Sequence, residues 1–283
     1  MEKFPAELLM KRETRVAYGT VPTHLFGNPL AQTTWQMQDG AFLLRAEGDH
    51  YFYYSRGEGI TVHRGAGADA SEESLWLNGS VYAAIASMNG LLPVHASAIA
   101  FDGKVFAFTG TAGAGKSTLA AALGQHGMAL FCDDTLILDL SDPDRMICLP
   151  GHKRLKLLPD ALELTGAARE EQVSQTYGKY YASPAAGTIA TALPLAELIF
   201  LEVGPTPSIK RISGSERFAR MQDDHQMSRL FEAASQFDRA AQFAHRSRLA
   251  RQIEMARFER PRDAAHFDAG LLLVADHVKG HGG

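Results

Sequence analysis

Cysteine is scarce in this chain, with only Cys132 and Cys148 among 283 residues. Two cysteines cannot form a framework of several disulfides, which excludes the small secreted proteins that such bridges hold together. No apolar run approaches the roughly 20 residues that a membrane-spanning helix needs, and Met1 to Gly19 lacks the apolar centre of a secretory signal. We therefore expect a cytoplasmic protein with no membrane partner.

Excess positive charge is missing as well. The chain has 28 Lys and Arg against 32 Asp and Glu, for a formal net charge of -4 at pH 7. Nucleic-acid-binding proteins usually present a basic surface to the phosphates, so we expect no nucleic-acid partner. A hydrophobic share of 46% is typical of a globular protein, and the length allows one large domain or two small ones.

Turn residues and periodicity divide the chain near residue 90. Ser71 and the acids after it begin a predicted helix that runs to about Met88, where an Asn-Gly pair ends it. The sequence therefore predicts a small β-rich segment plus a helix over 1–90 and a larger unit over 91–283. Three apolar runs before that helix are predicted as strands: Ala41 to Ala46, Tyr51 to Ser55 and Gly59 to His63.

The larger unit alternates between strand-like and helix-like runs. Leu195 to Val203 and Ser208 to Ile212 are predicted as strands, Gly214 to Glu254 as helical, and a last helix starts at Pro261. Residues 167–185 are polar and contain glycine, so we expect a mobile flap there.

The most informative motif is a complete phosphate-binding loop of the form G-x-x-x-x-G-K-[ST]. A β-prone run over 104–109 leads into it, and a helical run over 118–124 leads out. Glycines let successive backbone N–H groups point at phosphate oxygens, and the helix N-terminus adds partial positive charge. In such loops the lysine reaches the β- and γ-phosphates, and the serine hydroxyl ligates Mg²⁺. The residues predicted to bind nucleotide are Gly110, Thr111, Ala112, Gly113, Ala114, Gly115, Lys116, Ser117 and Thr118.

A hairpin argument brings His95 to this loop. Asp102-Gly103 is a favoured two-residue turn between strand-like runs, and its register would place His95 opposite Gly110. There the imidazole can hydrogen-bond a γ-phosphate or orient a neighbouring carboxylate. The alternative is a structural histidine at a strand end.

Two adjacent acids, Asp133 and Asp134, follow the apolar run Met128 to Cys132. In a short β-loop-α-β unit they emerge at the carboxyl end of a strand beside the loop, where ligands collect in parallel sheets. One carboxylate can hold Mg²⁺ together with Ser117, with Asp133 as the candidate, and the other can accept a proton from an attacking hydroxyl. The sequence leaves open which acid takes the proton, and a simple turn is the alternative role for the pair.

Two basic residues downstream are candidates for contacting the phosphates. Arg154 lies in the basic loop His152 to Lys156, and its planar fork suits a bidentate phosphate contact. Lys179, in the expected flap, can reach the nucleotide or the substrate. The alternative for both is a solvated basic surface.

The order of these motifs resembles the catalytic domain of bacterial HPr kinase/phosphorylase. The resemblance is carried by Leu92-Pro-Val-His95-Ala-Ser, by the phosphate-binding loop, and by Leu130-Phe-Cys-Asp133-Asp134. The run that starts at Arg154 and the closing Phe258-Glu-Arg-Pro-Arg262 are more similar to the smaller HPr-kinase-related proteins. Some of those are encoded with lasso-peptide biosynthetic genes and phosphorylate the precursor peptide on serine.

The resemblance implies a P-loop α/β domain with a mixed sheet and flanking helices, preceded by a small N-terminal β-rich extension. It implies that Lys116 and Ser117 serve phosphate and Mg²⁺, that Asp133 and Asp134 supply the base and a supporting carboxylate, and that His95 assists. ATP and Mg²⁺ are the implied cofactors, and a homo-oligomer is the implied assembly. The E-[IL]-R-G-[LI]-G run of the phosphorylase half is absent from this sequence.

We therefore predict an ATP-dependent kinase that phosphorylates a serine hydroxyl of a peptide or small protein. The resemblance suggests a ribosomally made precursor peptide of the lasso type as the substrate. Two other functions stay open from the sequence. One is a nucleotide-gated binding protein without group transfer, and the other is a small-molecule kinase or phosphoenolpyruvate-carboxykinase-like enzyme.

Overall fold

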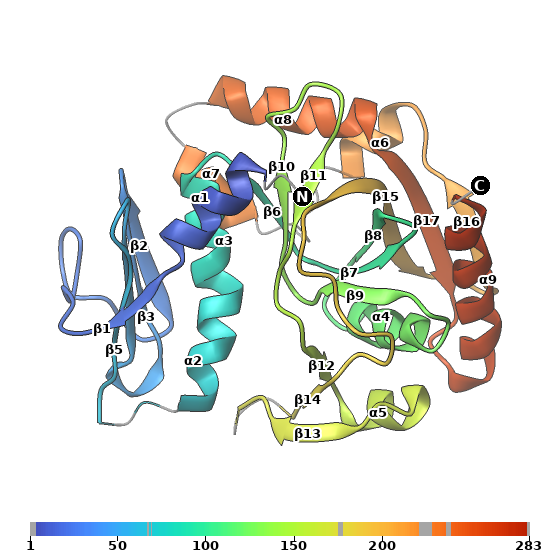
Figure 1. The fold of residues 1–283 in the computed structure, drawn as a ribbon, viewed down its shortest axis with the longest axis horizontal. Helices are drawn as coiled ribbons and strands as arrows, with labels where there is room; N and C mark the ends of the chain where they lie inside the picture. The colour runs from blue at the N-terminus through green and yellow to red at the C-terminus, as the bar shows by residue number, and fades with distance from the viewer. Residues whose placement is uncertain are drawn as a thin grey trace.

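The computed structural model describes residues 4–66, 68, 70–174, 178–220, 228–235 and 239–281. It is an α/β protein with a five-stranded sheet near the N-terminus, a larger mixed sheet and a small three-stranded sheet, all shown in Figure 1. No helix in these described ranges is both long and apolar enough to cross a membrane.

The N-terminal sheet has the strand order β1-β5-β4-β3-β2. Its three central strands confirm the predicted runs to within one residue, because each run is rich in apolar, aromatic or β-branched residues and turn residues separate the runs. The helix and the two outer strands that complete this part were not predicted from the sequence. The bounds are α1 (Pro5–Glu13), β1 (Val16–Tyr18), β2 (Thr34–Gln38), β3 (Ala41–Arg45), β4 (Tyr51–Ser55) and β5 (Gly59–His63).

The helix predicted over 71–88 is present, with an interruption. It consists of α2 (Ala70–Trp76), a π-helical turn (Leu77–Val81) and α3 (Tyr82–Met88). Gly79 causes the interruption, because its backbone has the non-helical angles φ -103° and ψ -106°. Helix α3 shares one apolar cluster with the N-terminal sheet and with strands of the larger sheet, so the two sheets pack on the same helix.

The larger sheet is built around three parallel strands. Strand β8 pairs with β15, and β15 pairs with β17, all in parallel, so their carboxyl ends lie at one edge. Strand β7 returns antiparallel to β8, and β9 pairs antiparallel with β7 on its far side. The strands are β6 (Leu92–Val94), β7 (Ala96–Phe101), β8 (Lys104–Thr109), β9 (Ala129–Cys132), β10 (Leu136–Asp139), β11 (Ile147–Leu149), β15 (Leu193–Val203), β16 (Ser208–Arg211) and β17 (Glu254–Arg260).

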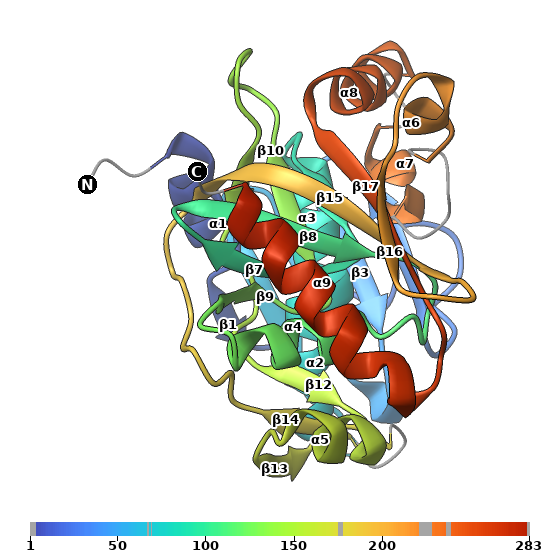
Figure 2. The same ribbon diagram turned by 90° about the vertical axis from the view of Figure 1, so that its right-hand side faces the viewer.

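Helices cover both faces of this sheet. Along β15, Ile199 and Leu201 pack toward α4 and α9, whereas Leu198 and Phe200 pack toward α7 and α8, as the period of two along a strand requires. Figure 2 shows α9 lying across the sheet on the first of these faces. The helices are α4 (Lys116–Gly124), α6 (Ser215–Arg220), α7 (Ser228–Ser235), α8 (Arg239–Gln252) and α9 (Phe267–Gly280).

The helical prediction over Gly214 to Glu254 needs correction. Three separate helices occupy its described part, residues 221–227 and 236–238 lie outside the described residues, and Glu254 begins strand β17. Pairing with β15 and β16 fixes β17, and the sequence does not reveal those distant partners. The last helix, α9, starts at Phe267 after a 3₁₀ turn (Ala264–His266), later than the predicted Pro261.

The expected flap over 167–185 contributes to the small sheet, in the order β12-β14-β13. Within it, Tyr177 and its two preceding residues lie outside the described residues. In the described remainder, β14 pairs with β12, and the backbone N–H of Lys156 on β12 donates a hydrogen bond to Asp133. The flap therefore borders the expected site. The bounds are β12 (Leu155–Leu157), α5 (Pro159–Thr165), β13 (Arg169–Gln172) and β14 (Tyr180–Ala182).

Candidate functional site

The hairpin that precedes the loop has the predicted register. Asp102 and Gly103 both have positive φ, 48° and 69°, which is the backbone form of a two-residue hairpin turn. Ala96 pairs with Thr109 at the other end of the hairpin, and the Thr109 hydroxyl donates a 3.1 Å hydrogen bond to the carbonyl of His95. The turn therefore fixes His95 at the root of the loop.

The glycines of the loop stand where side chains do not fit. Gly110 has φ 150°, and a Cβ there would lie 2.8 Å from the Leu201 carbonyl oxygen. Gly115 has φ 89°, and a Cβ there would lie 2.5 Å from Nη2 of Arg260. Gly110 requires glycine because its backbone angle and a rigid backbone neighbour coincide, whereas at Gly115 the left-handed backbone is the main reason, since the Arg260 side chain can move. The loop is thus held tightly between the ends of β8, β15 and β17.

Helix α4 starts directly after Gly115 and presents its N-terminus to the loop. Among the described residues, no side chain caps this end. The first N–H groups of a helix have no partner within the helix, and together with the helix dipole they favour an anion. The stretch from Thr111 to Gly113 is exposed, so a phosphate can approach the loop from solvent.

Lys116 is folded back onto the loop. Its ammonium donates hydrogen bonds to the carbonyl oxygens of Gly110 at 2.9 Å and Thr111 at 3.2 Å, and the side chain is buried. Burial lowers the pKa of Lys116, while the carboxylates of Asp134 and Asp133 oppose that shift. A phosphate arriving at the loop would offer this ammonium a charged acceptor in place of two carbonyl groups.

Asp133 joins the loop to the neighbouring strands. Its Oδ1 accepts hydrogen bonds from the hydroxyls of Ser117 at 2.8 Å and Ser97 at 2.6 Å, and its Oδ2 accepts one from the backbone N–H of Lys156 at 2.9 Å. The Asp133 side chain is 1% exposed, and these hydrogen bonds use both of its carboxylate oxygens. A carboxylate beside the loop serine is an oxygen donor set that suits Mg²⁺. Ser97, on β7, is a site residue to which the sequence analysis gave no role.

Asp134 has different surroundings from Asp133. Its Oδ2 accepts a 2.8 Å hydrogen bond from the Lys156 ammonium, its Oδ1 lies 3.4 Å from Nδ1 of His95, and its side chain is 30% exposed. Burial opposes its charged form, but Lys156 and His95 outweigh that effect and hold the pKa of Asp134 below its usual range. Asp134 therefore presents a charged carboxylate to solvent beside the loop.

His95 bonds to the backbone of the same residue. Its Nδ1 lies 2.9 Å from the carbonyl oxygen of Asp134. A carbonyl only accepts, so Nδ1 carries the proton and Nε2 carries the lone pair when the ring is neutral. Burial lowers the pKa of His95, and the Lys116 ammonium lowers it further, which keeps the ring neutral at pH 7.

The strand that carries the two acids is not the immediate neighbour of the loop strand. We predicted that the acids would emerge at the carboxyl end of a strand beside the loop, and Asp133 does contact the loop serine, although β7 lies between β8 and β9. The hairpin causes this arrangement. Strand β8, which leads into the loop, pairs with β7, and β9 pairs with the other edge of β7. The acids still reach the loop, since β9 runs in the same direction as β8 and Asp134 bends the chain with φ 77°.

The cation that contacts the acids is Lys156, whereas we expected Arg154 to meet the phosphates. Arg154 instead pairs with Glu170 at 2.5 Å and Glu171 at 2.6 Å, and its guanidinium lies 3.9 Å from the centre of the Tyr181 ring. Lys156 lies between two buried leucines on β12, and this alternation places its side chain on the face toward the acids. That alternation is the sequence signal that could have identified it.

Lys179 lies on the flap side of the site. Burial has the largest effect on the pKa of both Lys116 and Asp134. The charge of the Lys179 ammonium makes a smaller contribution, which lowers the pKa of each. The structure thus brings together the loop, His95 and both acids, adds Ser97 and Lys156 to them, and places Lys179 near enough to act electrostatically on the site.

A pocket of about 350 Å³ adjoins the outer side of the loop. Arg260 lies closest to the loop, where its Nη2 donates a 3.3 Å hydrogen bond to the carbonyl of Ala114. Arg260 lies on β17, which was not predicted as a strand from the sequence. This pocket was therefore not predicted either. The lining residues are Gly110, Thr111, Ala114, Phe200, Leu201, Glu202, Val203, Arg220, Arg260 and Arg262.

No protein-family model matches the chain, and no curated protein matches it either. Among solved structures, the chain is similar to the Hpr(Ser) kinase/phosphatase from Coxiella burnetii. The sequence identity is 16%, the TM-score is 0.36, and the similarity covers 67% of this chain and 89% of that one.

Proposed function

We propose that this protein is an ATP-dependent kinase that transfers the γ-phosphate to a hydroxyl group of a peptide or small protein. One observation carries the proposal: Asp133 is bonded to the loop serine Ser117, while the adjacent Asp134 stays accessible beside His95. A phosphate loop, a buried acid and an accessible acid in one place are the parts that phosphoryl transfer needs.

The loop and Lys116 would bind the β- and γ-phosphates. Backbone N–H groups at the start of α4 would donate to phosphate oxygens, and the ammonium would exchange its two carbonyl acceptors for a charged one. Ser117 and Asp133 would hold Mg²⁺, which neutralises charge on the phosphates when bound. The arginines of the adjoining pocket would contact the rest of the nucleotide.

Asp134 would accept the proton of the attacking hydroxyl. As the substrate oxygen forms a bond to the γ-phosphorus, the bond from phosphorus to the β,γ-bridging oxygen breaks, and its electron pair leaves with ADP. His95 would keep Asp134 in place through its backbone carbonyl, and Lys156 would balance the carboxylate charge. This assignment separates the two acids: Asp133 positions the metal, and Asp134 serves as the base.

The substrate hydroxyl in this proposal belongs to serine. Support comes from the resemblance of the His95, loop and Asp133-Asp134 motifs to HPr kinase/phosphorylase, together with a site that is open to solvent at Asp134. A ribosomally made precursor peptide of the lasso type is the substrate that the related small kinases suggest. The peptide would lie over residues 167–185, with a homo-oligomer as the proposed assembly.

The test is phosphorylation of a defined peptide pool. The full chain is incubated with ATP, Mg²⁺ and synthetic peptides that carry one central serine between varied residues, with a matched pool that carries alanine instead. We expect a phosphopeptide from the serine pool only, detected by mass spectrometry. Tight ATP binding without any phosphopeptide would contradict the kinase and favour a nucleotide-gated binding protein.

A further inference from the structure

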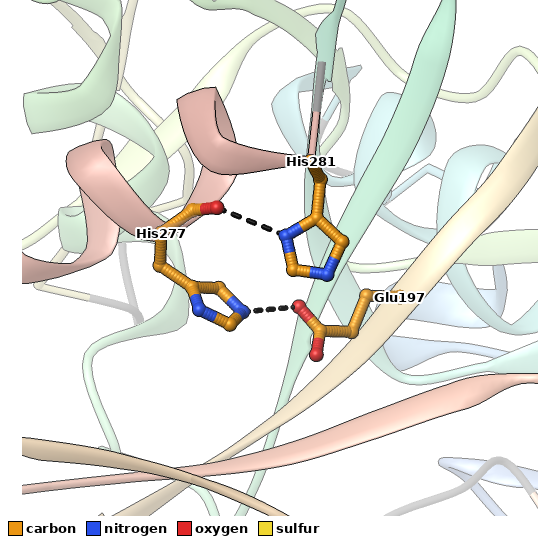
Figure 3. Close-up of side chains that lie close together, drawn as sticks. All are labelled: Glu197, His277 and His281. Atoms are coloured by element: carbon orange, nitrogen blue, oxygen red, sulfur yellow. Dashed lines mark hydrogen bonds and ion pairs between the residues drawn. The ribbon is translucent and has the colours of Figure 1, made fainter. Parts of the chain in front are cut away.

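A second group of chemically active side chains lies at the opposite end of the same strands. Glu197 stands near the start of β15, and His277 and His281 lie at the end of α9 (Figure 3). The potential ligand atoms of the three residues all lie within 4.8 Å of one another. Leu201, beside the phosphate loop, is four residues further along β15, which is about 13 Å at 3.3 Å per residue. The group is therefore separate from the candidate phosphoryl-transfer site.

The arrangement of the two histidines is that of metal ligands. They are four residues apart at the end of one helix, so their rings lie on the same face, with centres 4.6 Å apart. Nδ1 of His281 donates a 2.9 Å hydrogen bond to the carbonyl of His277, because a carbonyl can only accept. The lone pair of His281 is thus on Nε2, and Figure 3 shows that nitrogen on the side of Glu197. Metal-binding histidines commonly have their other ring nitrogen fixed in this way.

The third residue supplies negative charge. Glu197 is 3% exposed, and its Oε2 lies 2.6 Å from Nε2 of His277. Two imidazoles and one carboxylate are a donor set that binds Zn²⁺, with a fourth position left for water. Around a tetrahedral ion with bonds of about 2.1 Å, ligand atoms are about 3.4 Å apart. Small rotations of these side chains would give that spacing. They would lengthen the contact between His277 and Glu197 and shorten the longer distances between ligand atoms.

We propose that Glu197, His277 and His281 form a Zn²⁺ site that holds the end of α9 against the sheet. The backbone there is already anchored, since the Lys104 ammonium donates a 3.0 Å hydrogen bond to the carbonyl of His281. The ion would join a strand and a helix that are 80 residues apart in sequence. It would stabilise the C-terminal helix without taking part in phosphoryl transfer.

Calorimetric titration of the EDTA-treated full chain with Zn²⁺ tests the site. We expect one equivalent to bind, and the affinity to fall more than about 100-fold in Glu197→Gln and in His281→Gln, since each variant loses a direct ligand. His24→Gln, which changes an exposed histidine in the N-terminal part, is the matched control and should bind as the wild type does.

Two further readouts keep the result unambiguous. Melting temperatures in EDTA show that each variant folds, and the visible spectrum of the Co²⁺-loaded wild-type chain reports tetrahedral coordination. ATP binding should be unchanged in His281→Gln, so failure here is distinguishable from failure of the kinase proposal. Unchanged Zn²⁺ affinity in both ligand variants, or no saturable binding by the wild type, would overturn the proposal and leave a simple His277–Glu197 hydrogen bond.

Discussion

The two ends of strands β8 and β15 carry opposite kinds of chemistry. At the carboxyl ends, a glycine loop, a helix N-terminus and several lysines face two acids, which suits a phosphate with its metal ion. At the amino end of β15, a buried carboxylate faces two imidazoles, which suits a cation alone. Between them, Leu198 to Leu201 are buried among apolar side chains. Four buried apolar residues of β15 therefore lie between the two kinds of chemistry.

The accessible acid at the carboxyl edge should show the strongest effect on substitution. In Asp134→Asn, we expect turnover to fall about 10³-fold, because general-base catalysis contributes about 10² to 10⁴ in rate. Nucleotide affinity should change little, since Asp133 and Ser117 keep their contact. Rapid-quench kinetics and nucleotide titration measure the two quantities. Asp144→Asn, at an exposed turn, is the control, and an equal loss in both variants would contradict the role of Asp134.

The next effect distinguishes the two basic residues of the 152–156 loop. Lys156→Met should lower turnover about 10²-fold, because it removes the charged partner of Asp134 from the site. Arg154→Met should lower it less than about 10-fold, because Arg154 pairs with two flap glutamates instead of the acids. Steady-state kinetics of both variants provide the test. A larger loss in Arg154→Met would show that the arginine reaches the phosphates during the reaction.

A third test concerns Lys153, a largely buried lysine near the end of β9, and the effect of its pKa on the stability of the protein. Burial lowers the pKa of Lys153 to about 8 from its usual 10.5, and its ammonium contacts the Phe131 carbonyl. Between these two values the unfolded chain binds a proton that the folded chain does not, so this residue makes stability rise with pH. We expect a gain of about 1 to 2 kcal/mol from pH 8 to pH 9.5, after allowance for partial exposure.

Urea unfolding at both pH values, for the wild type and for Lys153→Met, isolates that contribution. The variant should lack the gain, because methionine keeps the shape of the side chain without its charge. The same pH slope in both proteins would mean that another group titrates.

The smallest effect concerns the shape of the loop. In Gly115→Ala, the new methyl group would stand 2.5 Å from Arg260 on a backbone with φ 89°, so Arg260 must move. We expect ATP to bind about 10-fold more weakly, which corresponds to about 1.4 kcal/mol. Gly19→Ala is the control, because its Cβ would meet only an ordinary contact of 3.6 Å. An unchanged ATP affinity would show that the pocket beside Arg260 takes no part in nucleotide binding.

The two strand ends also differ in how far the sequence could predict them. The loop and its hairpin register depend on neighbouring residues, so Gly110 to Thr118 and the place of His95 could be predicted. Lys156 depends on which face of β12 meets the acids, and Arg260 depends on β17, whose partners are distant in the chain. Glu197 and His277 are 80 residues apart, and only the packing of α9 on the sheet brings them together.

The proposed reaction is transfer of a phosphoryl group to a serine hydroxyl at the loop, with Asp133 and Asp134 taking part. A single-turnover experiment tests this reaction: the full chain is loaded with γ-labelled ATP and Mg²⁺ and then mixed with a serine peptide that the pool identifies. We expect label to leave ATP and to appear on serine at the same rate. Label that remains on ATP, or that appears only as free phosphate, would contradict it.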